Sequence, residues 1–226
     1  QNGPTMGGIS SGFMGDANDP GAPGSSGNSY GYYQQPPAGY LAANGGQLPG
    51  SLGCSGACPN GNGANDGVNL RLSIRVPTNA LSFSYDFRFF SAEYFTYQCT
   101  TYNDFYLALL TTGAQGIPAD GNISFDAQNN PVSVNNGFFE YCNPSGGQQC
   151  SPCINTIPLQ GTIPSMPTQG GATGWLQTTA PIVPGETMIL QLMIFDVSDD
   201  WLDSHTLIDN FQWSVDASDV GTGPPG

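Results

Sequence analysis

Residues 68–89 read VNLRLSIRVPTNALSFSYDFRF, two runs of alternating apolar and polar residues separated by a short turn. One face of the first run is apolar and consists of Val68, Leu70, Leu72, Ile74 and Val76. A period of two predicts β-strands that bury one face. Because only a Pro/Asn turn separates the runs, we expect them to form an antiparallel hairpin, with Arg71 or Arg75 placed to pair with Asp86.

Further strand candidates follow the same logic, and turn residues separate them. They are Asn103–Leu110, Asn122–Phe125, Val132–Asn135, Thr173–Thr178, Thr187–Asp196 and His205–Val215. No window shows a helical period. The sequence therefore predicts an all-β protein, an antiparallel two-sheet sandwich of jelly-roll type, over residues 65–216, with a C-terminal tail at 217–226.

Residues 1–64 have a different composition, dominated by Gly, Pro, Ser, Asn and Gln. Such a segment cannot build a core of its own. Its tyrosines are the natural anchors for packing on another surface; they are Tyr30, Tyr32, Tyr33 and Tyr40. We expect a long arm that is extended or packed on a neighbouring subunit, where it adds a strand to an open sheet edge and builds a homo-oligomer or polymer. A flexible spacer is the alternative.

The charge balance is strongly acidic. The chain has 17 Asp and Glu against three Arg and no Lys, a formal net charge of −14. This charge repels nucleic acid and anionic lipid, so we expect no nucleic-acid partner. No apolar run approaches the roughly 18 residues of a membrane-spanning helix, so we expect no membrane span.

Six cysteines in an acidic, lysine-free chain indicate disulfides in an oxidising compartment. They are Cys54, Cys58, Cys99, Cys142, Cys150 and Cys153. Spacing favours Cys54 with Cys58, and Cys99 with a member of the cluster from 142 to 153. A zinc site built from Cys54, Cys58, Cys150 and Cys153 is the alternative.

The segment DVSDDWLDSHTLID (Asp196–Asp209) places five carboxylates in fourteen residues, and no Lys or Arg follows Arg88. Crowded carboxylates without a cationic side chain must protonate or recruit a counter-ion. Hard oxygen ligands suit Ca²⁺ best, so we expect a calcium site. The ligands expected from this segment are Asp196, Asp199, Asp203 and Asp209, the last because it falls in apolar register on its strand. Alternatively, these acids are solvated turn residues.

Three blocks of the chain resemble the choice-of-anchor L domain of bacterial surface and secreted proteins. They are Ser82–Leu110 with SAEY and YNDFY, Gly121–Phe139 with PVSVNN, and Gly171–Trp213 with VPGET and DVSD. The resemblance implies a β-rich extracellular domain without an established catalytic role. It also brings in Glu93 and Asp104 as further calcium ligands. The chain departs from the family at Ala92, where a second acidic residue is usual, and shows no anchor signal after Val215.

These observations favour a secreted or cell-surface structural or adhesive protein, stabilised by calcium and able to form a filament or surface layer. We expect no enzymatic activity, because neither a catalytic pair nor a nucleophile stands out. A carbohydrate-binding, lectin-like module is the alternative, with a surface glycan as partner. Its stacking faces would come from Trp175, Trp201 and Tyr102.

Overall fold

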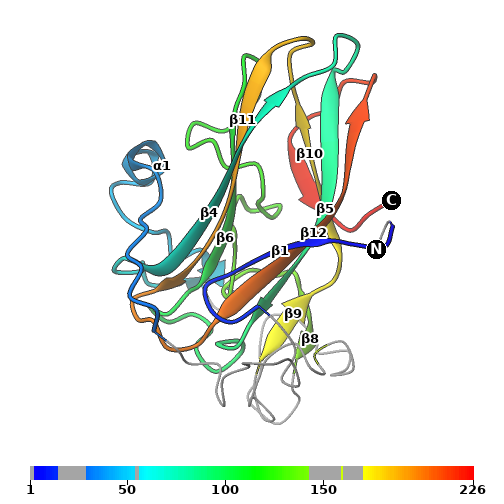
Figure 1. The fold of residues 1–226 in the computed structure, drawn as a ribbon. Helices are drawn as coiled ribbons and strands as arrows, with labels where there is room; N and C mark the ends of the chain where they lie inside the picture. The colour runs from blue at the N-terminus through cyan, green and yellow to red at the C-terminus, as the bar shows by residue number, and fades with distance from the viewer. Residues whose placement is uncertain (1–2, 15–28, 54–55, 143–158, 160–169) are drawn as a thin grey trace.

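The computed structural model describes residues 3–14, 29–53, 56–142, 159 and 170–226. Two antiparallel sheets pack face to face (Figure 1), which confirms the predicted sandwich. The larger sheet has the order β1-β12-β5-β10-β13, with β8 and β9 attached beside β5. Its strands are β1 (Gly7–Ser10), β12 (Ser204–Ser214), β5 (Ser82–Ser91), β10 (Leu176–Pro181), β13 (Gly221–Gly223), β8 (Phe139–Cys142) and β9 (Gly171–Thr173).

The smaller sheet has the order β4-β11-β6-β7. Its strands are β4 (Ala64–Arg75), β11 (Thr187–Val197), β6 (Phe105–Thr111) and β7 (Val132–Ser133). Outside the two sheets lie the short helix α1 (Ala38–Ala43) and a two-stranded ribbon of β2 (Leu52–Gly53) and β3 (Gly56–Ala57). No helix in the described part of the chain is long and apolar enough to cross a membrane.

The predicted hairpin of residues 68–89 is wrong, although both strands exist. β4 pairs with β11, and β5 pairs with β12 and β10, so the turn between them passes from one sheet to the other. Asp86 therefore does not face Arg71 or Arg75; it accepts hydrogen bonds from Gln177 and Asn210. Alternation predicts that a strand has two faces, but it does not choose the partner strand.

Most other predicted strands are present, with two differences. Residues 122–125 form only isolated bridges, Leu109 with Asn122 and Phe125 with Pro131. The segment 173–178 is divided between β9 and β10, with Gly174 and Trp175 between them.

The main core lies between the sheets. Phe83, Tyr85, Phe87 and Phe89 project into it from alternate positions of β5 and are almost fully buried. The Tyr106 hydroxyl donates to the Tyr85 hydroxyl over 3.1 Å, and Tyr85 pairs with Ser124 over 3.0 Å, so these buried polar groups are satisfied.

A second core covers the outer face of the smaller sheet. Phe105 and Phe195 stack there with ring centroids 5.6 Å apart. Tyr40 and Leu48, both from the arm, close this core and are each 2% exposed. Residues 37–50 thus pack on their own chain, with α1 beside β4 (Figure 1). Because β6 and β11 are buried on both faces, their sequences are nearly continuous apolar runs.

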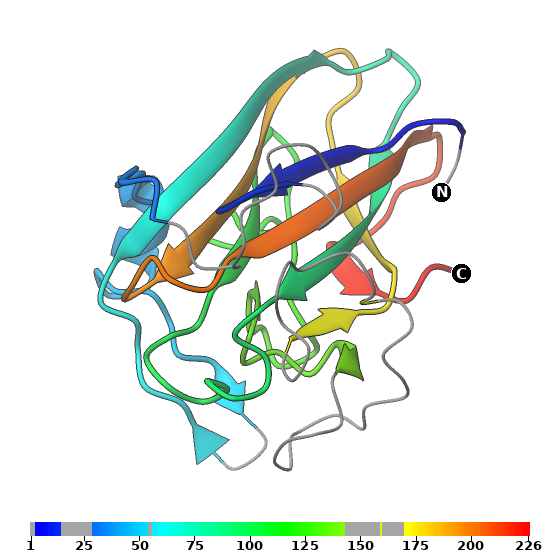
Figure 2. The ribbon, with the colours of Figure 1, turned by 60° about the horizontal axis from the view of Figure 1, so that its bottom comes forward.

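The two sheet edges on one side of the sandwich are β1 and β4 (Figure 2). β1 pairs antiparallel with β12, with Ile9 opposite Thr206 and 7% exposed. β4 leaves Val68 and Leu70 41% and 42% exposed. The face of β4 that carries Val68 and Leu70 was predicted to be buried. It is only half covered at this edge, because the opposing strand β1 is four residues long.

Candidate functional site

Four of the six predicted ligands are buried carboxylates at strand ends. Asp196 lies near the end of β11, Asp203 directly before β12, and Asp104 directly before β6; Glu93 follows β5 by two residues. Their exposed fractions are 0%, 6%, 0% and 1% respectively. The Ala92 N–H donates to the Asp203 carbonyl over 3.1 Å, which joins the Glu93 segment to the Asp203 loop. Antiparallel order in both sheets brings these strand ends to one region of the sandwich.

The other two predicted ligands are placed differently. Asp199 is half-buried in the loop before β12, and its charge acts on Glu93 and Asp104. Asp209 is also half-buried, but it lies opposite Asp86 in the middle of β12. It is five residues from Ser204, roughly 16 Å along an extended strand. A bulge between Asp209 and Gln212 shifts the register there. Asp209 was predicted to be a ligand because of its apolar register on the strand. The structure instead places it in the middle of β12, away from the carboxylates at the strand ends.

One buried acid was missed. Asp66 on β4 is 2% exposed, and its charge acts on Asp196. Its two carboxylate oxygens accept hydrogen bonds from Tyr30 N at 2.7 Å and Tyr32 N at 2.9 Å. Its sequence context, Asn65-Asp66-Gly67, is typical of an exposed turn and does not indicate burial.

Glu93, Asp104, Asp196 and Asp203 form what we call the acidic cluster. Hydrogen bonds satisfy some of its carboxylate oxygens and leave others unsatisfied. Asp104 accepts from Val197 N at 3.1 Å and from the Ser204 hydroxyl at 2.5 Å, and its carboxyl lies within hydrogen-bond reach of Glu93. Among the described residues, neither carboxylate oxygen of Asp196 makes a hydrogen bond of good geometry, nor does Glu93 Oε2, although the Ser11 side chain lies within hydrogen-bond reach of Asp196. Buried oxygens without partners are rare in folded proteins and call for a ligand or a proton.

Burial dominates the electrostatics. Loss of water raises the pKa of Glu93, Asp104 and Asp196. Neighbouring carboxylates raise the pKa of Glu93 and Asp196 further, whereas hydrogen bonds from Ser204 and Val197 partly offset the rise at Asp104. His205 supplies no positive charge, because burial lowers its pKa to about 4. Arg88 lies over the rings of Phe90 and Tyr141 and donates to the Thr173 carbonyl.

The arm closes one side of the acidic cluster. The Ser11 side chain lies beside Asp196, and its hydroxyl donates to the Ser204 carbonyl at 3.2 Å. Gly12 packs so tightly that an added Cβ would lie 2.0 Å from Asp203 Cγ. The Ser29 hydroxyl donates to Asp200. Residues 10–12 and 29–32 of the arm therefore pack against the segments that carry Asp66 and residues 196–204.

The carboxylates are not arranged as a finished metal site. Within the part of the chain that the structure describes, no three His, Cys, Asp or Glu side chains are placed so that they would hold a metal ion as they stand. Ca²⁺ also takes backbone carbonyls, hydroxyls and water, in sets of about six to eight oxygens. The cluster offers hard oxygens and negative charge in a buried place.

The predicted cysteine pairing is wrong. Cys58 forms a disulfide with Cys99, with their Cα atoms 4.8 Å apart. Cys58 is therefore not a thiolate ligand, which removes the four-cysteine zinc alternative. Cys142 is also disulfide-bonded, and Cys54, Cys150 and Cys153 lie outside the described residues. The Cys58–Cys99 bond ties the segment before β4 to the loop that carries Glu93 and Asp104, a link between distant segments that spacing alone does not indicate.

The residues predicted for glycan stacking and assembly are scattered. Trp201 is 68% exposed, whereas Trp175 and Tyr102 are half-buried, and Tyr102 packs edge-on against Tyr97. Of the arm tyrosines, Tyr40 belongs to the second core, and three are exposed. The exposed fractions of Tyr30, Tyr32 and Tyr33 are 45%, 67% and 72%.

Fold and disulfide together define a disulfide-bonded antiparallel β-sandwich protein. The chain belongs to the choice-of-anchor L domain family, whose model matches residues 57–212, more than half of the 226 residues. Membership indicates a bacterial cell-surface or secreted protein. No curated protein and no solved structure matches the chain.

Proposed function

We propose that the protein is a structural protein of the bacterial surface, or a secreted one, whose sandwich is stabilised by Ca²⁺ and which assembles with copies of itself. The ion would bind among Glu93, Asp104, Asp196 and Asp203. The observation that carries the calcium proposal is Asp196, which is fully buried and whose carboxylate oxygens make no hydrogen bond of good geometry with a described residue; only the Ser11 side chain comes within reach.

The surroundings favour calcium over other ions. Among the described residues, the donors are carboxylate, hydroxyl and carbonyl oxygens, with no thiolate and one neutral imidazole nearby, a set typical of Ca²⁺ rather than Zn²⁺. Mg²⁺ requires a tighter octahedron and is usually held together with phosphate. The Ser11 and Ser204 hydroxyls add neutral oxygens beside Asp196 and Asp104.

Calcium would lock separate segments together. Glu93 and Asp104 flank the loop between β5 and β6, whereas Asp196 and Asp203 flank the loop between β11 and β12. An ion shared by these loops stabilises the folded protein only, because the unfolded chain has no such site. That is a useful property for a chain with 17 acidic residues and only three basic ones.

Melting curves in millimolar calcium and in chelator test this proposal. Calcium should raise the melting temperature of the full chain, and Asp196→Asn should remove most of that rise. Asp219→Asn, an exposed acid of the C-terminal tail, is the matched control and should respond as the parent does. Equal melting with calcium and with chelator would refute the metal site.

Self-assembly is supported by the edge of β4. Beyond Gly67, whose N–H donates to the Tyr32 carbonyl, no described strand pairs with the outer side of this twelve-residue strand. Arg71 and Arg75 are exposed there, so two of the three cations of the chain lie on one open strand. Opposite charge on a second copy, which is acidic elsewhere, would pair with this edge.

The same charges disfavour a closed dimer. If two β4 edges met around a two-fold axis, four arginines would share one interface. A heterologous contact between β4 and an acidic surface of the next copy avoids this and generates open chains. The exposed Tyr32 and Tyr33 lie at the start of the same edge and would extend the contact.

The assembly test uses point variants, because residues 37–50 complete the second core and their deletion would expose it. Arg71→Glu with Arg75→Glu should shift the protein toward monomer in light scattering, and added salt should do the same to the parent. Arg71→Lys with Arg75→Lys keeps the charge and should assemble. Assembly that persists in the glutamate variant would exclude this edge.

A further inference from the structure

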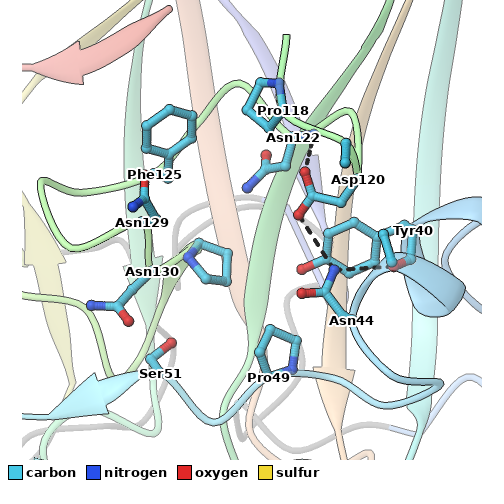
Figure 3. Close-up of a pocket in the computed structure, with 13 residues that line it drawn as sticks. Tyr40, Asn44, Pro49, Ser51, Pro118, Asp120, Asn122, Phe125, Asn129 and Asn130 are labelled. Carbon is cyan, nitrogen blue, oxygen red and sulfur yellow. Dashed lines mark hydrogen bonds between the residues drawn. The ribbon is translucent and has the colours of Figure 1, made fainter.

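A pocket lies between the arm and the loops that follow β6 (Figure 3), and it shares no lining residue with the acidic cluster. Its volume is about 360 Å³, within the range of small-molecule sites. The arm contributes Tyr40, Asn44 and Ser51, and residues 118–131 contribute Asp120 and Phe125. The pocket thus exists only because the arm packs on its own domain.

Its polar groups are held in fixed positions. Asn44 Nδ2 donates to Asp120 Oδ2 over 3.3 Å and to the Tyr40 carbonyl over 3.0 Å. The other oxygen, Asp120 Oδ1, accepts from Asn122 N over 3.0 Å. Each carboxylate oxygen can accept a further hydrogen bond, so Asp120 is oriented without being saturated.

Ser51 adds an unsatisfied group. Its hydroxyl oxygen is buried and has no hydrogen-bond partner among the residues described. Its backbone lies in the left-handed region, with φ of 68°, which a serine occupies at a conformational cost. A bound hydroxyl group would satisfy this oxygen.

The remaining lining is uncharged and combines apolar side chains with the amides of Asn122, Asn129 and Asn130. Phe125 is half-buried, and three proline rings line the cavity: Pro49, Pro118 and Pro131. Asp120 is the only charged residue of the lining, in a chain whose net charge is −14. Anionic ligands are therefore repelled, whereas a ring with polar edges and apolar faces matches these walls.

We propose that this pocket binds one neutral sugar residue. Asp120 and Ser51 hydrogen-bond sugar hydroxyls, and Phe125 contacts the apolar face of the ring. The proposal is independent of the cation, and it places glycan binding away from Trp201.

Saturation-transfer NMR of the full chain with glucose, galactose, mannose and N-acetylglucosamine tests the proposal. At least one sugar should give signals, and glucuronic acid should give none. Asp120→Asn should weaken binding at least about tenfold, because it removes a charged acceptor. Trp201→Ala, outside the pocket, is the control and should bind as the parent does.

A second variant guards against misfolding of the first. Ala119 is an exposed residue of the lining, so Ala119→Trp should block the pocket while the melting temperature stays unchanged. Absence of binding by all four neutral sugars would overturn the proposal. So would undiminished binding by the folded Ala119→Trp variant, or equal binding of glucuronic acid.

Discussion

The response of stability to pH and calcium together is the sharpest test of the acidic cluster. Burial raises the pKa of Glu93, Asp104 and Asp196, so without a cation the folded protein retains protons that the unfolded chain releases above about pH 4. The sign follows from proton binding. Stability is greatest below that pH and falls as pH rises toward the raised pKa values.

The magnitude follows from the number of protons retained. Each one changes the free energy of unfolding by about 1.4 kcal/mol per pH unit. Lowering the pH from about 8 to about 6 should therefore stabilise the calcium-free protein by about 3 kcal/mol for one proton and about 5 kcal/mol for two. For a protein of this size that is roughly 5–20 °C in melting temperature. His205, with its pKa lowered to about 4, stays neutral across this window.

Calcium should change this profile, because it replaces the retained protons. Saturating calcium should flatten the pH dependence and raise the melting temperature far more at pH 8 than at pH 6. The assay is a set of calorimetric melts across this range, in calcium and in chelator. An equal calcium effect at both pH values, or a calcium-free protein that melts at the same temperature throughout, would refute the reasoning.

Three further predictions concern the segments around the site. Gly12→Ala should displace the arm from Asp203, lower the free energy of unfolding by about 2–3 kcal/mol through exposure of Ile9, and reduce the calcium response; Gly8→Ala, whose Cβ makes its one tight contact with the flexible end of Met14, should have none of these effects. Replacing Cys58 and Cys99 by Ser should lower the free energy of unfolding by about 4 kcal/mol, from the separation of 41 residues that the bond closes; a small change in denaturant titration would contradict this. Tyr40→Ala should cost about 3–5 kcal/mol by opening the second core, measured by the same titration against Tyr33→Ala, an exposed tyrosine expected to be neutral.

The strands were predictable because their signal is local. Alternation in residues 68–76 and 81–89 is readable from neighbours along the chain, as is the apolar run of β11. The choice of partner strand was not predictable from such local patterns, because β4 and β5 are consecutive in the chain yet lie in different sheets. Disulfide pairing failed for the same reason: Cys58 meets Cys99 through the fold, not through spacing.

The acidic site shows the same division. By itself the sequence determined that the carboxylates after Arg88 lack cationic side chains of their own region, and it predicted that they bind a hard ion. Only the tertiary structure decided which of them meet. It brought in Asp66 and Ser11, left Asp209 in the middle of β12, and closed the cluster with the arm. Composition determines how much negative charge must be neutralised. The packing of segments that are distant in the sequence determines which carboxylates are buried away from water.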